Sequence, residues 1–344
     1  MRGGRSAVAL PVAFALLACS SGSTDPDTPE AASVCAAPLA GVEVGGFAPV
    51  VDVSPSPTRR VVLMGGGPEA DAGARAFVEA AAGGDVLILR ASGSLTSYPN
   101  YFRDDLAPTP APNSVETVKT TDPAAAAQAA VLCRIANAEA IWLAGGNQNN
   151  YLRGWPRAVH DALAAARDRG VAIGGTSAGS VSLGEAAFDA REGSVTSPEA
   201  LLDPFRPDVT LTYPSWAQPE LDGTYVDSHY MDRDREGRLL VFLARFLTDR
   251  AYDAVVGIGL DEGMALVIED GTYRVERSTR RPAENAAWLY EVPGPASISG
   301  GSPLDLAAIR RVRLLEGATG AWPLDFDAAT STPLAVTNGV VHPG

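Results

Sequence analysis

A serine in a Gly-x-Ser-x-Gly frame is the residue of this sequence best suited to chemistry. Residues 174–180 read Gly-Gly-Thr-Ser-Ala-Gly-Ser and follow an apolar run at 171–173, which predicts a buried strand that turns sharply into a helix. Such a turn exposes the hydroxyl of Ser177, and the small neighbours let a substrate approach. The pattern predicts that Ser177 is a nucleophile; a Gly-rich turn with an incidental serine is the alternative.

A serine hydroxyl is a weak nucleophile until a base takes its proton, and His229 is the best candidate for that base. The chain has three histidines. His160 falls in a predicted helix before the nucleophile strand, and His342 lies in the C-terminal tail. His229 ends a predicted strand at 225–229, after the serine. By elimination, we predict that His229 is the general base.

The carboxylate that should orient this histidine is less well defined. Four acids between the serine and the histidine are candidates: Glu185, Asp189, Glu192 and Glu199. We favour Glu192, with Asp189 and Glu199 as alternatives, because Glu185 comes early and falls in a predicted helix.

Arginines follow the histidine closely, interleaved with acids over residues 232–238. Arg233, Arg235 and Arg238 could bind a carboxylate through paired hydrogen bonds. A salt-bridged helix start is an equally good interpretation. Asp227 precedes His229 by two residues and would share its face of a strand, where it could contact substrate.

Three Gly-rich turns, at 65–67, 145–146 and 174–179, each follow an apolar strand. Short strands that alternate with helices predict a mostly parallel sheet flanked by helices, in which ligands bind at the carboxyl ends of the strands. The three turns should therefore lie together at one edge of the sheet. We predict that the N–H groups of Ala178 and Gly146 form an oxyanion hole.

The length of 344 residues, with 46% hydrophobic and 20% charged residues, fits one large globular unit with appendages. We place an α/β domain at 60–281 and a small β-rich extension at 282–344. The net charge of −14 disfavours binding to nucleic acid. No Cys-x-x-Cys pair is present, and we expect no metal and no cofactor.

The N-terminus predicts export. In residues 1–18, two arginines precede an apolar stretch too short to span a bilayer. The following Cys19 fits the lipid-bearing position of a bacterial lipoprotein, and an ordinary cleaved signal is the alternative. Residues 19–59 read as a flexible tether. We expect an envelope or secreted protein whose only membrane contact is a lipid anchor. Cys35 and Cys133 could form a disulfide or remain separate thiols.

Four segments together resemble the cyanophycinases, serine peptidases of family S51 that are related to peptidase E. In chain order they are 142–148, 175–179, 227–239 and 257–262. They resemble the family's Thr-Gly-Gly-Asp-Gln segment, its nucleophile elbow, its Asp-Gln-His-Phe run with the arginines that follow, and its Gly-Ile-Gly-Ile-Asp-Glu segment. The match spans roughly residues 60–270.

The resemblance implies a class I glutamine-amidotransferase-like, flavodoxin-like α/β fold. It implies hydrolysis of cyanophycin, a poly-aspartate with arginine on each side chain, to β-Asp-Arg dipeptides. Ser177 would be the nucleophile and His229 the base. The residues implied to line the substrate groove are Gln148, Asp227, Arg233, Arg235 and Arg238.

Two departures weaken the substrate assignment and leave the hydrolase assignment intact. Asn147 stands where the family has an aspartate, and Ser228 stands where it has a glutamine. An aspartyl dipeptidase of the peptidase E type and an α/β-hydrolase esterase remain alternatives, although the esterase's His-Gly-Gly-Gly segment is missing. A non-catalytic surface binding protein is a third alternative. A homodimer is compatible with the sequence.

Overall fold

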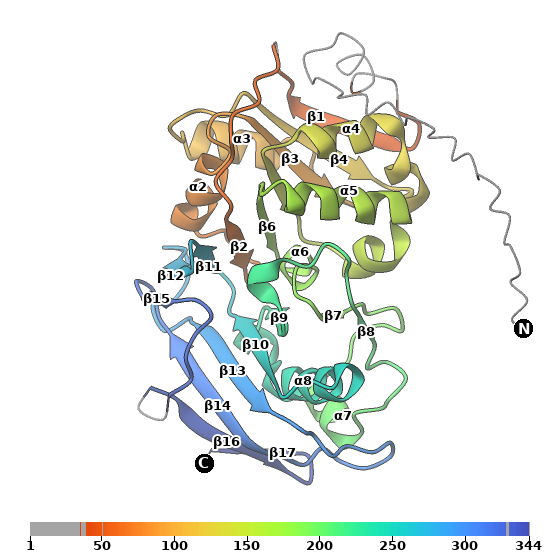
Figure 1. Ribbon diagram of the computed structural model, residues 1–344, viewed down its shortest axis with the longest axis vertical. Coiled ribbons are helices and arrows are strands. Elements are labelled where there is room, and N and C mark those ends of the chain that lie inside the picture. The colour runs from red at the N-terminus through yellow and green to blue at the C-terminus, as the bar shows by residue number, and fades with distance from the viewer. Residues whose placement is uncertain (1–34, 36–38, 50, 328–329, 344) are drawn as a thin grey trace, which may run out of the picture.

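The computed structural model describes residues 35, 39–49, 51–327 and 330–343, and Figure 1 labels its elements. The expected signal at 1–18 and the lipid site at Cys19 lie outside these residues. Within the described part of the chain, none of the helices combines the length and apolar character needed to cross a bilayer. Cys35 and Cys133 form a disulfide, which joins the N-terminal segment to helix α4 (Ala129–Asn137).

A large mixed sheet forms the upper part of the molecule in Figure 1. Its five central strands, β4, β3, β5, β6 and β2, run parallel, and strands at both edges run antiparallel. In spatial order, its strands are β1 (Val42–Phe47), β4 (Ser114–Thr120), β3 (Asp85–Arg90), β5 (Ala140–Leu143), β6 (Ala172–Thr176), β2 (Val61–Met64), β11 (Met264–Glu269), β12 (Thr272–Arg277) and β15 (Thr319–Ala321).

The apolar runs of the parallel strands are continuous because both faces of the sheet are covered. In β2, Val61 and Leu63 pack on one face with α4 and α5 (Arg157–Asp168). Val62 and Met64 pack on the opposite face with α2 (Asp71–Glu79). Figure 1 shows α4 and α5 crossing the near face of this sheet. The predicted fold class, a mostly parallel sheet flanked by helices, is confirmed.

A second sheet forms the lower part of the molecule, and helix α8 (Glu236–Arg250) packs on it through Leu239 and Leu243. Only β9 and β10 are parallel in it, and the remaining pairs of described strands are antiparallel. In spatial order, its strands are β17 (Val340–Pro343), β16 (Thr332–Thr337), β14 (Leu306–Leu314), β13 (Ala287–Pro293), β10 (Ala254–Leu260) and β9 (Thr224–Ser228).

Two expected boundaries need correction. Residues 42–47 of the predicted tether form β1, because they pair with β4 along its outer edge. The C-terminal extension is β-rich, as predicted, but it does not begin a separate unit at 282. Its first strand, β13, pairs with β10 over residues 254–260, so the extension continues a sheet that starts within the α/β region.

Short elements complete the chain. The small sheet of β7 (Ala187–Phe188) and β8 (Leu211–Thr212), with α7 (Ser197–Leu202) between them, lies in the excursion after Ser177. The remaining short helical segments are α3 (Ser97–Asn100), α6 (Ala178–Val181), and the 3₁₀ or π segments Tyr101–Asp105, Pro123–Ala127, Asn150–Gly154, Pro219–Leu221 and Met231–Arg233.

Candidate active site

Ser177, His229 and Glu262 form a hydrogen-bonded chain. Ser177 Oγ lies 2.8 Å from His229 Nε2, and His229 Nδ1 lies 2.7 Å from Glu262 Oε1. A carboxylate at Nδ1 fixes the tautomer that leaves Nε2 free to accept a proton. The three residues therefore have the geometry of a Ser-His-acid triad.

Each of these three residues comes from a different part of the fold. Ser177 follows β6 of the first sheet, and His229 follows β9 of the second. Glu262 lies on the turn between β10 and β11, where the chain crosses from the second sheet to the first. The site therefore sits at the junction of the two sheets.

The turn at Ser177 is strained and tightly packed. Ser177 has φ 53° and ψ −120°, a conformation that non-glycine residues rarely adopt. Its N–H donates to the carbonyl of Met64 at 3.0 Å, which anchors the turn to the neighbouring strand β2. A Cβ on Gly179 would lie 1.9 Å from the carbonyl oxygen of Leu143, so only glycine fits there. This packing confirms the predicted strand–turn–helix around the serine.

The Gly-rich turn at 65–67 packs against His229 and helps to hold it in place. His229 donates its backbone N–H to the carbonyl of Gly65 at 2.8 Å. A Cβ on Gly66 would lie 2.5 Å from Cε1 of the His229 ring, and one on Gly67 would lie 2.9 Å from Glu262 Oε2. These glycines therefore let the imidazole and the carboxylate approach the backbone, a use of this turn that the sequence did not show.

His229 is well suited to accept a proton at neutral pH. Burial lowers the pKa of His229 below its ordinary value, the hydrogen bond with Glu262 opposes that shift, and the charges of Arg233 and Arg235 add to it. The imidazole is therefore neutral at pH 7, as a general base must be.

The structure does not bring Glu192 to His229, which corrects our choice of orienting acid. Glu192 is exposed in a turn. Asp189 is buried and accepts from the Thr210 hydroxyl, and Glu199 caps helix α7 together with Thr196. The acid comes instead from the segment 257–262, whose resemblance to Gly-Ile-Gly-Ile-Asp-Glu was the available signal.

Asp227 and Arg238 form a buried ion pair and do not line an open groove. Arg238 Nε and the second guanidinium nitrogen lie 2.8 and 2.6 Å from the two oxygens of Asp227. The exposed fractions of the two side chains are 4% and 0%. Burial raises the pKa of Asp227, but the charges of Arg238 and Arg235 together hold it below its ordinary value. The sequence-based assignment of this pair to substrate contact is therefore corrected to a structural one.

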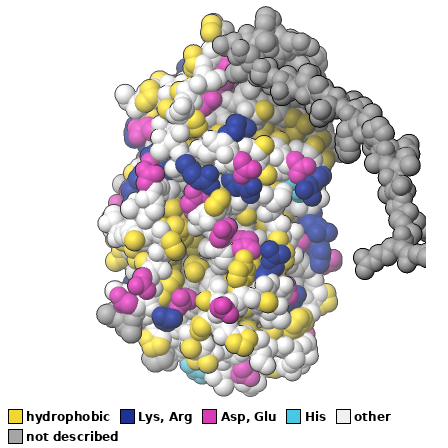
Figure 2. Space-filling model, in the orientation of Figure 1, with side chains coloured by type: hydrophobic (Ala, Val, Ile, Leu, Met, Phe, Trp, Pro, Cys, Tyr) yellow, Lys and Arg dark blue, Asp and Glu magenta, His cyan; other side chains and the backbone are white. Residues whose placement is uncertain are grey.

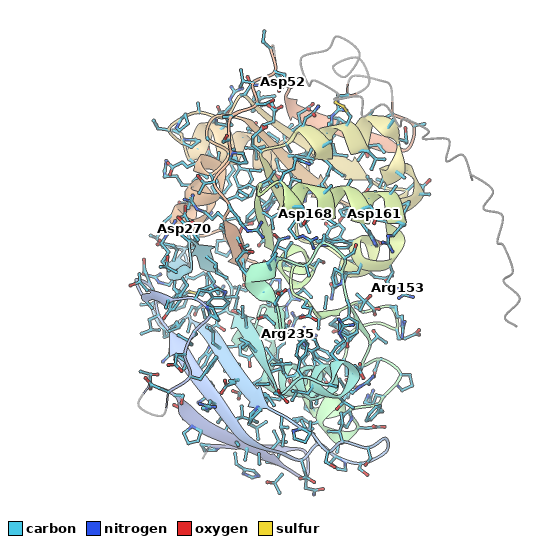
Figure 3. The ribbon with its side chains drawn as sticks, viewed as in Figure 1. Asp52, Arg153, Asp161, Asp168, Arg235 and Asp270 are labelled. Atoms are coloured by element: carbon cyan, nitrogen blue, oxygen red, sulfur yellow. A yellow bond between two sulfur atoms is a disulfide. The ribbon has the colours of Figure 1, made fainter. Side chains whose placement is uncertain are left out.

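The other two arginines lie closer to solvent. Arg235 lies near the middle of the molecule (Figure 3) and donates to Asp227 at 3.1 Å and to the Ser228 carbonyl at 2.6 Å. Arg233 is exposed, and none of the described residues forms a hydrogen bond or ion pair with its guanidinium. Since its charge acts on His229, Arg233 is a cation near the triad that remains available to a ligand.

Ala178 directly follows the nucleophile, and Gly146 directly follows Gly145, which packs against Ser177. Ala178 begins α6, so its N–H has no acceptor within that helix. Gly145 is adjacent, since a Cβ on it would lie 3.4 Å from Ser177 Cβ. Gly146, exposed with φ +146°, and the half-buried Gln148 follow in the same turn. Strand order places β5, β6 and β2 side by side, which confirms that the three Gly-rich turns converge.

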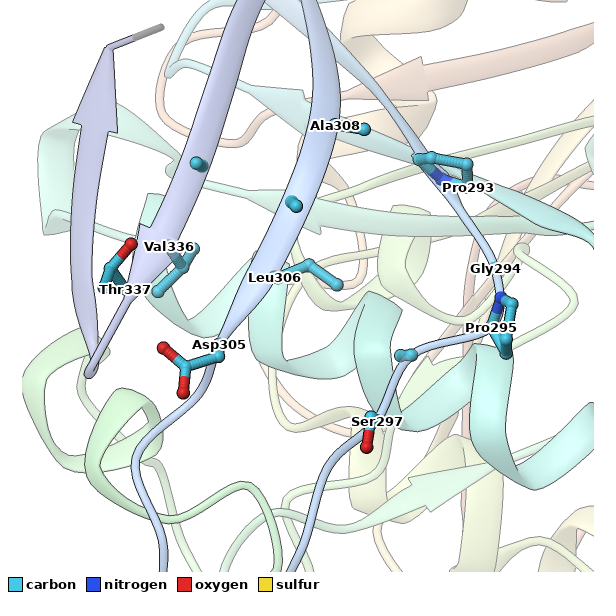
Figure 4. Close-up of a pocket in the computed structure, with 12 residues that line it drawn as sticks. Pro293, Gly294, Pro295, Ser297, Asp305, Leu306, Ala308, Val336 and Thr337 are labelled. Carbon is cyan, nitrogen blue, oxygen red and sulfur yellow. The ribbon is translucent and has the colours of Figure 1, made fainter.

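A cavity on the second sheet lies apart from the triad. It has a volume of about 470 Å³ between β13, β14 and β16, lined by residues such as Pro295, Leu306 and Val336 (Figure 4). It contains none of Ser177, His229 and Glu262. In the described part of the chain, no cluster of three or more His, Cys, Asp or Glu side chains is placed to hold a metal ion.

Comparison with known proteins identifies one family. The model of peptidase family S51 matches residues 86–276, a range that includes all three members of the hydrogen-bonded chain. None of the curated proteins matches the chain.

Two solved structures are similar to this chain. One is a peptidase from an acI-B1 Actinobacterium, with 14% identity, a TM-score of 0.49, and coverage of 78% of this chain and 98% of that one. The other is a putative peptidase E protein from Listeria monocytogenes EGD-e, with 15% identity, a TM-score of 0.41, and coverage of 64% and 99%.

Proposed function

This chain belongs to peptidase family S51 and is a serine peptidase, and we propose that Ser177, His229 and Glu262 perform its chemistry. The observation that carries the proposal is the continuous hydrogen-bonded chain from Ser177 Oγ through the imidazole to Glu262 Oε1. No other histidine of the described residues lies against this serine.

We propose the following reaction, which the geometry supports. His229 Nε2 takes the Ser177 proton as Oγ attacks the scissile carbonyl, and the imidazolium that forms is stabilised by Glu262. The N–H groups of Ala178 and Gly146 receive the negative charge that develops on the carbonyl oxygen. His229 then protonates the leaving amine, which breaks the C–N bond and leaves an acyl ester on Ser177. Water, deprotonated by His229, hydrolyses that ester and restores the serine.

We propose that the substrate carries a carboxylate, as aspartyl and β-aspartyl peptides do. The free guanidinium of Arg233 beside the triad supports this substrate class, because arginine binds carboxylates through paired hydrogen bonds. The resemblance of four segments to cyanophycinases makes cyanophycin the first polymer to test. Export through residues 1–18, with a lipid on Cys19, belongs to the same proposal, because it suits an enzyme that meets polymer released by other cells.

Purified protein should react with a fluorophosphonate probe, and Ser177→Ala should remove all labelling. Incubation with cyanophycin should release β-Asp-Arg dipeptides, identified by mass spectrometry. A short-chain nitrophenyl ester, assayed in parallel, tests for an esterase. A labelled protein that cleaves only the ester would overturn the peptide substrate, and a wild-type protein that does not label would overturn the triad.

Arg233→Met should raise KM for an aspartyl peptide about tenfold or more, because it removes one charge-assisted contact. The same change should leave KM for a neutral ester unchanged. Arg153→Met, at another exposed arginine, is the matched control. An equal effect on both substrates would show that Arg233 does not contact the carboxylate.

A further inference from the structure

The orienting carboxylate is itself held by a second chain of contacts. While Oε1 of Glu262 faces the histidine, Oε2 lies 3.0 Å from a guanidinium nitrogen of Arg281. The same nitrogen forms an ion pair with Asp232. The other oxygen of Asp232 accepts the backbone N–H of Glu262 at 2.9 Å. Arg281 and Asp232 thus contact both the side chain and the main chain of Glu262.

The local fold is shaped to place Arg281 there. Arg281 follows β12, and its N–H donates to the carbonyl of Ser278 at 3.1 Å. Its own carbonyl accepts from Arg277 at 2.5 Å. Gly263, which follows Glu262 and has φ +77°, leaves room for the side chain, because a Cβ there would lie 2.5 Å from Arg281 Cγ. A larger residue at Gly263 would therefore displace the Arg281 side chain.

The three side chains are partly buried, with exposed fractions of 25% for Arg281, 24% for Asp232 and 21% for Glu262. Ion pairs that remain in contact with water contribute little to folding stability. A glutamate side chain has several rotatable bonds, and a free Oε2 would let the carboxylate turn away from the imidazole. Small misplacements in a catalytic group cost large factors in rate. The contacts are therefore better explained by orientation than by stability.

We propose that Arg281 is a positioning residue of the active site, which holds Glu262 in the orientation that bonds His229, and that Asp232 holds Arg281. This inference rests on the proposed function, since it assigns Glu262 as the orienting acid. Arg281 lies beyond residue 276, where the match to the family ends. Arg281 therefore belongs to the part of the chain that leads into the C-terminal strands, while Asp232 and Glu262 lie within the match.

Arg281→Met should lower kcat about 10- to 100-fold and leave KM within about twofold, because the substrate contacts stay in place. Arg281→Lys, which keeps the positive charge but lacks the planar guanidinium, should recover part of the lost kcat. The matched control is Arg274→Met, which removes ion pairs with Glu269 and Glu276 from the preceding strand and should leave kcat unchanged.

A spectroscopic readout separates positioning from folding. The proton between His229 Nδ1 and Glu262 should give a far-downfield ¹H NMR signal in the wild type, which is lost in His229→Gln. In Arg281→Met that signal should shift or broaden, while the methyl region stays that of a folded protein. If Arg281→Met does not fold, Asp232→Asn serves as the test variant instead. It is a milder change, at the residue that holds Arg281.

The outcomes distinguish the two proposals. Suppose that the wild type reacts with the fluorophosphonate, and that the Arg281 and Asp232 variants label at the same rate and keep the downfield signal. This result would overturn the positioning role and leave the proposed function intact. A wild type that neither labels nor hydrolyses peptide would overturn the proposed function, and the role of Arg281 with it. Slower labelling in Arg281→Met, with part of the wild-type rate recovered in Arg281→Lys, would support both proposals.

Discussion

The charges around His229 determine over which pH range Ser177 can be activated. Burial and the positive charges of Arg233 and Arg235 favour the neutral imidazole, whereas the hydrogen bond with Glu262 and the charge of that carboxylate favour the imidazolium. The neutral form is the base. The active form of the enzyme therefore persists to lower pH than an unperturbed histidine would allow.

We expect the acid limb of kcat/KM to have its midpoint below 6.5, the ordinary pKa of histidine. Arg233→Met should move that midpoint upward, because removing a nearby positive charge raises the pKa of the imidazole. Rates measured from pH 4 to 9 on a neutral ester test both shifts without involving a substrate carboxylate.

A second group near the nucleophile titrates in the same range and needs a control. Burial raises the pKa of Glu69 to about 7, against the opposing effects of the Tyr98 hydroxyl, which donates to Glu69, and of Thr176, the residue before Ser177. Glu69→Gln removes this titration. If the midpoint lies near 7 and the acid limb disappears in that variant, the limb belongs to Glu69 and the interpretation of His229 is wrong.

Residue types alone were enough to find the serine and the histidine, because a Gly-x-Ser-x-Gly turn and a scarcity of histidines leave few choices. They were not enough to find the acid. Surface carboxylates are frequent in this chain, and the partner of His229 lies after it in sequence, on a turn between two sheets. Likewise, nothing local shows that Asp227 turns toward Arg238. Strand β9 ends at Ser228, and the positive φ of His229 redirects the chain.

At the scale of elements, the turn at 65–67 connects the nucleophile strand to its partners. It follows β2, which pairs with β6, and it packs against both His229 and Glu262. The convergence of the Gly-rich turns could be predicted, because strand–helix alternation is a local pattern with one common topology. Which turn contacts which side chain depends on the second sheet, so the sequence pattern did not reveal it.

Gly66→Ala should lower kcat about 100-fold or more, because a Cβ at 2.5 Å from the His229 ring displaces the base. Gly170→Ala is the matched control. Both glycines have positive φ, 90° and 79°, but a Cβ on Gly170 meets nothing within 4 Å. Each change adds a backbone strain of about 1–2 kcal/mol.

Thermal unfolding and kcat, measured side by side, separate the two effects. The melting temperatures of Gly66→Ala and Gly170→Ala should fall similarly, and only the first should lose activity. Full activity in Gly66→Ala would mean that the turn does not hold the imidazole in place.

At the scale of the whole molecule, the C-terminal strands complete the site. β13 pairs with β10 along its length, and Asn285 donates to the backbone carbonyl of Glu262 at 2.9 Å. Figure 2 shows acidic and basic side chains intermixed on the visible face of the molecule. The sequence indicated a β-rich extension but not its pairing, since strand partners far apart in the chain leave no local signature.

A chain ending at residue 281 should lose fluorophosphonate labelling, because β10 would keep β9 as a partner but lose β13, and the turn that carries Glu262 would lose its support. A chain ending at 338 removes only the outer strand β17 and should retain labelling. Circular dichroism of both proteins reports how much secondary structure survives. A soluble 1–281 chain that labels at the wild-type rate would show that the extension is dispensable for catalysis.

The order in which the three members of the triad occur along the chain has a consequence for biosynthesis. Ser177 is made well before His229, Glu262 and Arg281, and β13 is made later still. A ribosome-bound chain therefore carries a hydroxyl without a proton acceptor. We therefore expect the peptidase to be inactive until its last sheet has formed.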